Sequence, residues 1–260
     1  MSKRLVLIKL GGSLITDKHQ PFTAQPERIT FLAQQLAGAC EQAPKADFIV
    51  GTGAGSFGHF TAHEYGLREG AHDQKQYYGM SVTHNAVARL GTMVAQALTD
   101  AQLPALTMSP AAWLTCANGT LDSVAIQPLK NLLEQGCIPM LHGDTITDSQ
   151  RGTTILSTEK VLQACLSELR ASYDECIVIY LLDIDGVLDQ EGAVMPELAA
   201  DQEVTVRKSL DHDVTGGIIG KVASARLAAQ TADAVYIASG ANAGVLSELL
   251  TGGITGTRVR

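Results

Sequence analysis

Short apolar runs alternate along this chain with longer segments in which apolar residues recur every three to four positions. Continuous apolar runs are typical of parallel strands buried on both faces, and the longer period is typical of amphipathic helices. The runs lie at 4–10, 48–50, 104–110, 137–141, 177–182 and 234–238, and the periodic segments at 26–40, 81–102, 128–135, 157–171, 213–231 and 242–250. This alternation predicts an α/β fold with a mainly parallel sheet covered by helices on both faces.

A few segments depart from the alternation. Asn118-Gly119 is the strongest short hairpin signal in the chain, and a second hairpin is predicted over 145–155. The polar and aromatic stretch 66–80 is predicted to be an ordered loop or lid, and 254–259 an edge strand. Since no low-complexity linker interrupts the pattern, we expect a single domain spanning 1–260.

Composition narrows the class of protein. The 260 residues are 45% hydrophobic, which is ample for the core of one large domain. A net charge of −8 argues against a nucleic-acid surface, although an anionic ligand in a locally basic pocket is still allowed. The five cysteines include no CxxC pair, and no signal peptide or eighteen-residue apolar run is present. We therefore expect a soluble cytoplasmic protein with reduced thiols and no membrane partner.

The most informative stretch is the glycine-rich loop 51–59, which follows the second apolar run. Glycines at 51, 53, 55 and 58 let backbone N–H groups approach a ligand closely, and such a strand-to-helix turn is an anion site. His59 adds a further hydrogen-bond donor at the end of the loop. A tight turn with one exposed histidine is the alternative interpretation. A dinucleotide fingerprint is not indicated, because the loop follows the second strand instead of the first.

Residues suited to anions recur after other predicted strands, where open α/β sheets bind their ligands. Lys9 interrupts the first buried run just before Gly11-Gly12-Ser13. A buried lysine needs a partner, so Lys9 is expected to face an anion; a side chain that reaches the surface is the alternative. Three further segments occupy corresponding places: Gly143-Asp144, Asp183-Ile-Asp185 and Thr215-Gly-Gly…Lys221.

Lysines without an acyl nucleophile indicate phosphoryl transfer. This reaction needs in-line positioning and charge compensation, usually with a magnesium ion held through the nucleotide phosphates. The chain lacks the P-loop and the protein-kinase motifs. Taken singly, each residue has a structural alternative: Asp144 as a turn-capping carboxylate, Asp183 and Asp185 as turn residues, and Lys221 as a surface lysine.

Five features follow one another along the chain: Lys9-Leu-Gly-Gly-Ser13, the glycine loop, Gly143-Asp144, Asp183-Ile-Asp-Gly186 and Gly216-Gly217…Lys221. Together, in this order and along the whole chain, they resemble the amino acid kinase superfamily. Gly12-Ser-Leu-Ile-Thr-Asp-Lys18 and Gly55-Ser-Phe-Gly-His59 are most similar to the isopentenyl phosphate kinases, because the amino-acid-phosphorylating relatives lack this histidine. The resemblance implies a three-layer αβα sandwich with an open, mainly parallel central sheet. It also implies an acceptor-substrate lobe over 1–172 and a nucleotide-binding lobe over 173–260.

The resemblance assigns roles to matching residues. The catalytic residues would be Lys9, Lys18, His59, Asp144 and Lys221, with Asp144 orienting the lysines and His59 hydrogen-bonding the acceptor phosphate. ATP would contact Lys9, Gly11, Gly12, Ser13, Gly55, Asp183, Asp185, Gly186, Gly217 and Lys221. The acceptor phosphate would contact Ala54, Gly58, His59, Gly143, Ser157 and Thr158. No general base is needed, since a phosphate monoester with a second pKa of about 6 is already nucleophilic near neutral pH.

Other residues receive no such role. Mg²⁺ would be held through the nucleotide phosphates, without protein ligands. The remaining histidines are predicted to be surface or packing residues; they are His19, His63, His72, His84, His142 and His212.

One segment departs from the family pattern. Ser157-Thr158-Glu159 stands where the isopentenyl phosphate kinases carry Ser-Gly-Asp, at the start of a helix expected to offer N–H groups to the acceptor phosphate. Thr158 keeps the N–H and adds a hydroxyl, but its side chain narrows the pocket. The departure therefore bears on the identity of the acceptor, not on the reaction type.

The expected reaction is ATP plus isopentenyl phosphate giving isopentenyl diphosphate plus ADP, with Mg²⁺ and in a homodimer. The isoprenoid tail would lie against Tyr77, Tyr78, Met80, Val87, Leu90 and Met93. Two alternatives remain open. A kinase for fosfomycin or another small phosphonate would share the lysines and the histidine but need a small polar pocket. A catalytically silent nucleotide-binding regulatory protein is the other.

Overall fold

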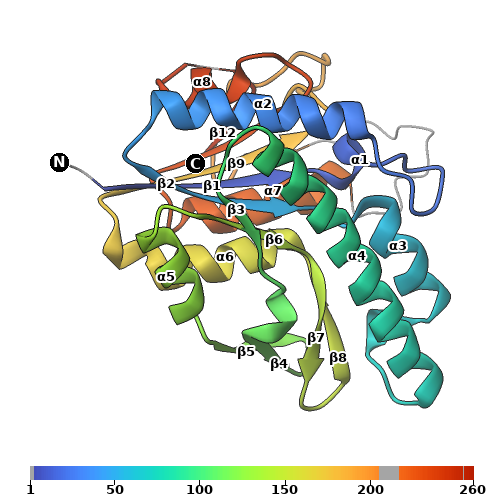
Figure 1. Cartoon of the computed structure of the whole chain (residues 1–260). Helices are drawn as coiled ribbons and strands as arrows, with labels where there is room; N and C mark the ends of the chain where they lie inside the picture. Colours follow the sequence, from blue (N-terminus) through green and yellow to red (C-terminus); the bar gives the residue numbers. More distant parts are fainter. Residues whose placement is uncertain (1–2, 205–216, 254) are drawn as a thin grey trace.

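The apolar runs form the central sheet of a computed structural model that describes residues 3–204, 217–253 and 255–260 (Figure 1). The strands are β1 (Arg4–Leu10), β2 (Ala46–Thr52), β3 (Ala105–Thr107), β6 (Ile138–His142), β9 (Glu175–Leu182), β10 (Glu197–Leu198), β11 (Ala234–Ser239) and β12 (Thr257–Val259). Their order is β10-β12-β11-β9-β1-β2-β6-β3, and every pairing is parallel except that of β11 with β12. The mainly parallel sheet is confirmed. The prediction of an edge strand at the end of the chain is wrong, because β12 lies between β10 and β11.

Helices cover both faces of the sheet, because successive strand residues point to opposite sides. On the side of Val6 and Ile8 lie α2 (Pro26–Gln42), α4 (Gln74–Asp100) and α8 (Val245–Leu250). On the side of Leu5 and Leu7 lie α5 (Gln127–Glu134), α6 (Thr158–Leu169) and α7 (Gly217–Ala229). Each side is one continuous cluster of buried apolar side chains, so the three-layer αβα sandwich is confirmed.

A second sheet of four strands, in the order β5-β4-β7-β8, extends below the main sheet in Figure 1. Its hairpins are β4 (Leu114–Ala117) with β5 (Thr120–Val124), and β7 (Asp144–Asp148) with β8 (Gly152–Leu156), as predicted. Asn118 and Gly119 both have positive φ, as a type I′ turn requires. The Asp148 carboxylate joins the two turns by accepting the N–H groups of Asn118 at 3.0 Å and Arg151 at 2.9 Å.

Shorter helices follow several strands. β1 is followed by α1 (Gly12–Ile15) and β2 by α3 (Gly55–Glu64), and single turns of 3₁₀ helix lie at η1 (Leu67–Glu69), η2 (Pro110–Ala112) and η3 (Arg170–Ser172). None of the helices in the described residues is long and apolar enough to span a membrane.

The prediction of a loop or lid over 66–80 is wrong for its second half. α4 begins at Gln74 rather than near Ser81, and the Asp73 carboxylate caps it by accepting the N–H of Gln76 at 2.7 Å. An aspartate that accepts a backbone N–H in the first turn is a standard helix start. Tyr77 and Tyr78 therefore belong to the first turns of a long helix.

Candidate active site

The carboxyl ends of β1, β2, β6 and β9 meet at one edge of the main sheet (Figure 1). Leu10 pairs with Thr52 and with Leu181, and Thr52 pairs with His142. The segments that follow these strands are the ones that the sequence singles out. They are Gly11–Ser13, Gly53–Gly55, Gly143-Asp144 and Asp183–Gly186. Four separate stretches of sequence thus converge on one place, as ligand sites of open α/β sheets do.

The two glycine turns after β1 and β2 are pressed against each other. A Cβ on Gly53 would lie 2.6 Å from the backbone nitrogen of Gly12, and a Cβ on Gly12 would overlap the backbone of Gly55. Gly55 also has a φ of 49°, which side-chain-bearing residues rarely adopt. Only glycine permits this approach, which brings the first turns of α1 and α3 together. N–H groups in the first turn of a helix lack an intrahelical acceptor and favour anions.

Lys9 points from β1 into the α6 side of the sheet and forms an ion pair with Glu159 in the first turn of α6. The side chains are 6% and 14% exposed. Burial alone would raise the pKa of Glu159, but the charge and hydrogen bond of Lys9, together with hydrogen bonds from the Glu159 N–H and from Ser157, lower this pKa overall. The prediction that Lys9 is buried against an anion holds, with a protein carboxylate as that anion. An ammonium has three N–H donors, so two remain for a ligand.

This pair corrects one assignment. Asp144 was expected to orient the lysines, yet Lys9 is held by Glu159 and Asp144 lies in a different network. The carboxylate of Glu159 reaches Lys9 because α6 begins beside the end of β1. The sequence feature that points to this contact is Glu159, an acidic residue in the first turn of α6 and in the segment that departs from Ser-Gly-Asp.

Thr158 fits closely under the neighbouring strand. A Cβ on Gly51 would lie 2.6 Å from its Cγ2, so a side chain at position 51 would force the Thr158 side chain to move. The Thr158 hydroxyl donates to the carbonyl of Thr52 at 2.6 Å and is therefore turned onto β2. A Cβ on Gly143 would lie 3.0 Å from the backbone nitrogen of Thr158. The structure thus brings Gly143 and Thr158 together, and Ser157 caps α6 by accepting the N–H of Lys160.

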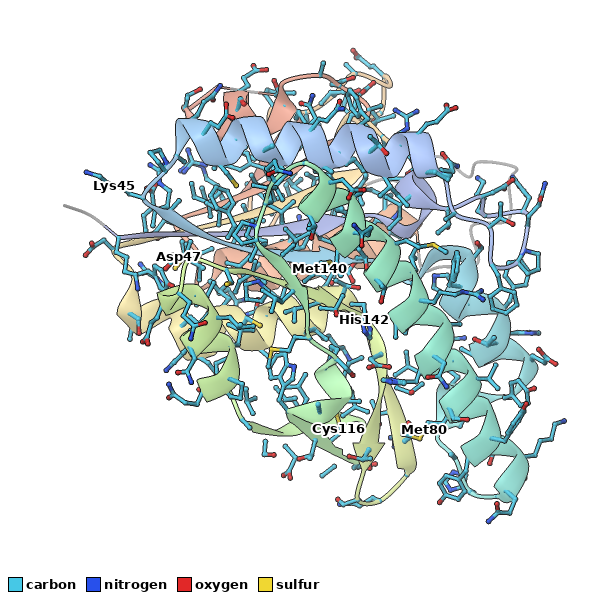
Figure 2. All side chains as sticks on the ribbon, viewed as in Figure 1. Lys45, Asp47, Met80, Cys116, Met140 and His142 are labelled. Carbon is cyan, nitrogen blue, oxygen red and sulfur yellow. The ribbon has the colours of Figure 1, made fainter. Side chains whose placement is uncertain are left out.

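Asp144 is the centre of a buried polar network between α4 and the start of β7. It is 2% exposed and accepts hydrogen bonds from His84 Nδ1 at 2.9 Å, the Ser109 hydroxyl at 3.2 Å and the backbone N–H of Thr145 at 2.8 Å. His142 Nδ1 lies 3.8 Å from the same carboxylate (Figure 2). His84 and His142 are packing residues, as predicted, but polar ones whose role the sequence did not reveal.

The pKa values of the two histidines in this network are shifted in opposite directions. The hydrogen bond to Asp144 raises the pKa of His84, whereas burial lowers that of His142. The stability from His84 is therefore complete below its ordinary value of 6.5 and declines as pH rises through its folded pKa. His142 has the opposite effect on stability. Its pKa is lowered in the folded protein, so just below pH 6.5 the unfolded chain binds the proton more readily and protonation favours unfolding.

We expect His84→Ala to lower the free energy of unfolding by about 1.5–3 kcal/mol at pH 6, since a buried carboxylate loses a charge-assisted partner. The difference from wild type should shrink at pH 8.5. Urea unfolding at both pH values measures it, with the exposed His63→Ala on α3 as control. An equal difference at both pH values would contradict this assignment.

The other predicted catalytic residues lie on three separate elements. Lys18 is exposed in the loop after α1, His59 is exposed on α3 one turn beyond Gly55, and Lys221 is partly buried on α7. Asp183 and Asp185 are exposed after β9, while Gly186 is packed so that a Cβ would lie 2.7 Å from Thr257 Oγ1. α7 begins at Gly217, and Thr215, Gly216 and His212 lie outside the described residues.

The six residues predicted to line an isoprenoid pocket do not share one face. Leu90 is fully buried in the core between α4 and the sheet, whereas Tyr77, Tyr78 and Met93 are 46%, 63% and 41% exposed. Val87 does lie at the site, because its Cγ1 would be 2.9 Å from a Cβ on Gly58. Met80 lies on the same helix near the β7–β8 hairpin, and its carbonyl accepts the Thr145 hydroxyl at 3.3 Å (Figure 2). The prediction of one six-residue pocket is therefore wrong.

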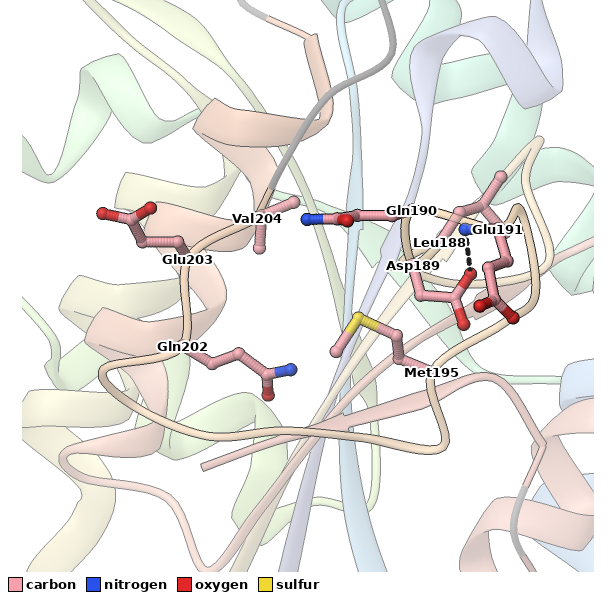
Figure 3. Close-up of a pocket in the computed structure, with 8 residues that line it drawn as sticks. All are labelled: Leu188, Asp189, Gln190, Glu191, Met195, Gln202, Glu203 and Val204. Atoms are coloured by element: carbon pink, nitrogen blue, oxygen red, sulfur yellow. Dashed lines mark hydrogen bonds between the residues drawn. The ribbon is translucent and has the colours of Figure 1, made fainter.

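Two hollows lie away from the glycine turns. One, of about 340 Å³, lies between residues 188–195 and 202–204, after β9 (Figure 3). Among the described residues its lining consists of Leu188, Asp189, Gln190, Glu191, Met195, Gln202, Glu203 and Val204. The other, of about 620 Å³, lies at the start of α2, over Gln25, Pro26, Glu27, Arg28 and Phe31.

No group of three or more His, Cys, Asp or Glu side chains among the described residues is arranged to hold a metal ion. The chemistry of the site is instead that of a phosphate cradle: backbone N–H groups at the glycine turns and at the start of α6, beside the buried Lys9. Such a set fits a nucleotide whose phosphates carry their own Mg²⁺.

Comparison with known proteins agrees with this geometry. Residues 4–239 match the amino acid kinase family. An isopentenyl phosphate kinase from Haloferax volcanii is 35% identical over 223 residues, covering 84% of this chain and 86% of the relative. One from Methanothermobacter thermautotrophicus is 27% identical over 98% of both chains. An X-ray structure of isopentenyl phosphate kinase superposes with a TM-score of 0.80 at 25% identity, over 98% of this chain and 99% of that one.

Proposed function

This chain belongs to the amino acid kinase family, among its isopentenyl phosphate kinases, and from this premise we propose how its residues phosphorylate isopentenyl phosphate with ATP. An oxygen of the acceptor phosphate attacks the γ-phosphorus of ATP, the bond from that phosphorus to the bridging oxygen breaks, and ADP leaves. The observation that carries the proposal is the buried Lys9–Glu159 pair beside two glycine turns. It offers a fixed positive charge where a transferring phosphoryl group would pass.

In this proposal the lysines compensate charge on the transferring group. Lys9 uses one N–H for Glu159 and directs the other two at the phosphates, while Lys18 and Lys221 approach from the loop after α1 and from α7. The transition state has little covalent demand, so fixed positive charge and backbone N–H groups supply most of the stabilisation. Mg²⁺ held through the nucleotide phosphates would neutralise further charge there.

The acceptor phosphate would lie between α3 and α6. The N–H group of Thr158 would bind it, with His59 as a further donor and Gly143 leaving room beside Thr158, while the N–H of Gly55 would face the transferring phosphoryl group. Because the Thr158 hydroxyl is bonded to Thr52, it is not available to the acceptor. We propose that three apolar side chains, instead of the six, contact the isoprenoid tail: Met80 and Val87 on α4 and Ile155 on β8. The Ile155 side chain is 38% exposed.

The proposal also covers the two lobes of the chain, its oligomeric state and its compartment. Residues 1–172 would carry the acceptor and 173–260 the nucleotide, with Asp183, Asp185, Gly186 and Gly217 bordering ATP. We propose a homodimer in the cytoplasm, and the five cysteines, all of them free thiols, support a reducing compartment.

The acceptor separates this function from its alternative. ADP release is measured with ATP and Mg²⁺ in the presence of isopentenyl phosphate, fosfomycin or no acceptor. We expect turnover with isopentenyl phosphate well above the other two. Turnover with fosfomycin alone would replace the acceptor, and ATP binding without turnover on either would favour a regulatory protein.

His59 provides a prediction specific to the acceptor. His59→Ala should lower kcat/KM for isopentenyl phosphate by about 10- to 100-fold, through a higher KM, a lower kcat or both. The reason is the loss of a charge-assisted hydrogen bond of about 1.5–3 kcal/mol. KM for ATP should change little. Steady-state kinetics with each substrate varied in turn measure this, with His63→Ala on the same helix as control. A rise in KM for ATP alone would place His59 at the nucleotide.

A further inference from the structure

The loop that carries Lys18 is attached to α3 and α4 by two aromatic rings and an arginine, and we propose that Phe22 and Arg89 are positioning residues that act through Lys18. The inference rests on the proposed role of Lys18 at the phosphates. It adds two residues that lie outside the glycine turns and that neither the motifs nor the comparisons single out.

The loop is closed at its base. Thr16 and Ala24 form an isolated antiparallel bridge, and the N–H of Asp17 donates to the carbonyl of Thr23 at 2.9 Å. Lys18 lies just inside this closure and is exposed. A long lysine side chain on an exposed loop has many accessible conformations, so its reach depends on how firmly the loop is held.

The loop is also bonded to the first turn of α3. The N–H of Phe22 donates to the carbonyl of Ser56 at 3.3 Å, and the Ser56 hydroxyl donates to the carbonyl of Thr23 at 3.4 Å. From the other side, the N–H of Ser56 donates to the Thr16 hydroxyl at 3.0 Å. The loop with Lys18 and the helix with His59 are therefore joined through Ser56, one residue after Gly55.

The ring of Phe22 completes the attachment. It meets the fully buried Phe57 edge to face, with centroids 6.0 Å apart at 86°. The guanidinium carbon of Arg89, on α4, lies 5.6 Å from the centroid of Phe22 and 5.2 Å from that of Phe57. Edge-to-face rings and a cation over their faces are both attractive arrangements. One arginine thus connects α4, α3 and the loop.

The backbone of Phe22 indicates that this arrangement is more than packing. Phe22 has a φ of 55°, a conformation that bulky residues rarely adopt, and its side chain is 42% exposed. Turn chemistry would favour glycine or asparagine here, and core packing would bury the ring. A strained, exposed aromatic residue beside a functional loop is explained if its ring holds the loop in place.

The test is a double-mutant cycle with Lys18. Phe22→Asn keeps a residue that tolerates this φ but removes the ring, and Phe22→Tyr keeps the ring. Turnover of isopentenyl phosphate and the melting temperature are measured for wild type, Phe22→Asn, Phe22→Tyr, Lys18→Ala and the Phe22→Asn/Lys18→Ala double variant. Arg89→Lys and Arg89→Met extend the series, because lysine retains a cation over the rings.

We expect Phe22→Asn to lower kcat about ten- to hundredfold through misplacement of Lys18, with little change in KM for isopentenyl phosphate. Phe22→Tyr should retain wild-type kcat, and Arg89→Lys should retain more than Arg89→Met. In the Lys18→Ala background, Phe22→Asn should have no further effect on kcat.

Equal loss from Phe22→Asn in both backgrounds would overturn the inference, as would an unchanged kcat in Phe22→Asn or in Lys18→Ala. In each of these cases, wild-type turnover of isopentenyl phosphate leaves the proposed function standing. Absence of that turnover in the wild type would instead be a failure of the proposed function.

Discussion

Replacing Lys9 by methionine is expected to lower kcat by about 10²–10³-fold, the loss seen when one preorganised electrostatic group is removed from a transition state. Methionine keeps the volume of the side chain, so the strands around position 9 need not repack. KM for either substrate should change less than kcat, because the charge matters most when the phosphoryl group is in transit. Steady-state kinetics with wild-type protein as reference measure both constants.

The same substitution should destabilise the fold. Glu159 would be left as a buried carboxylate without its counter-charge, which typically costs about 3–5 kcal/mol. The double variant Lys9→Met/Glu159→Gln removes both charges and should recover most of this free energy of unfolding while remaining inactive. If the double variant regained activity with its stability, Lys9 would have a structural role only.

Glu159→Gln is expected to lower kcat by about 10²-fold, because Lys9 loses the carboxylate that fixes its ammonium group and small misplacements near a reacting centre have effects of that size. Glu159 touches no reacting atom in this account and is a positioning residue. Glu159→Asp keeps the charge and should retain part of the activity.

Glu168→Gln is the matched control for this substitution, since Glu168 is exposed on the same helix. It should leave both kcat and the unfolding free energy unchanged. Wild-type kcat in Glu159→Gln, measured with saturating ATP and isopentenyl phosphate, would show that the ion pair does not position Lys9 for the reaction.

The sheet and its helices could be predicted because their signal is periodic. The run 4–10 is apolar at nearly every position and becomes β1, with odd residues toward α6 and even residues toward α2. The start of α4 was missed because Gln74 to Tyr78 is polar and aromatic, so the apolar period begins only later. Asp73, three residues before Gln76, was the available sign of a helix start.

The glycine turns could be located from the sequence, but the partners of the charged residues could not. Whether Lys9 meets Asp144 or Glu159 depends on where α6 begins relative to β1, which no local pattern encodes. For the same reason no local pattern pairs His84 on α4 with Asp144 on β7, although the two side chains are hydrogen-bonded. The prediction of the isoprenoid pocket is wrong for a similar reason. Helical spacing shows which residues share a face, but not which face is turned to the core, and Leu90 faces the core.

The most direct test of the central claim is the fate of the γ-phosphate, followed by ³¹P NMR in a reaction of wild-type protein, ATP, Mg²⁺ and isopentenyl phosphate. The account predicts that the isopentenyl phosphate signal is replaced by the coupled signals of a diphosphate, formed in step with ADP. ADP formed together with inorganic phosphate, while isopentenyl phosphate stays unchanged, would contradict it.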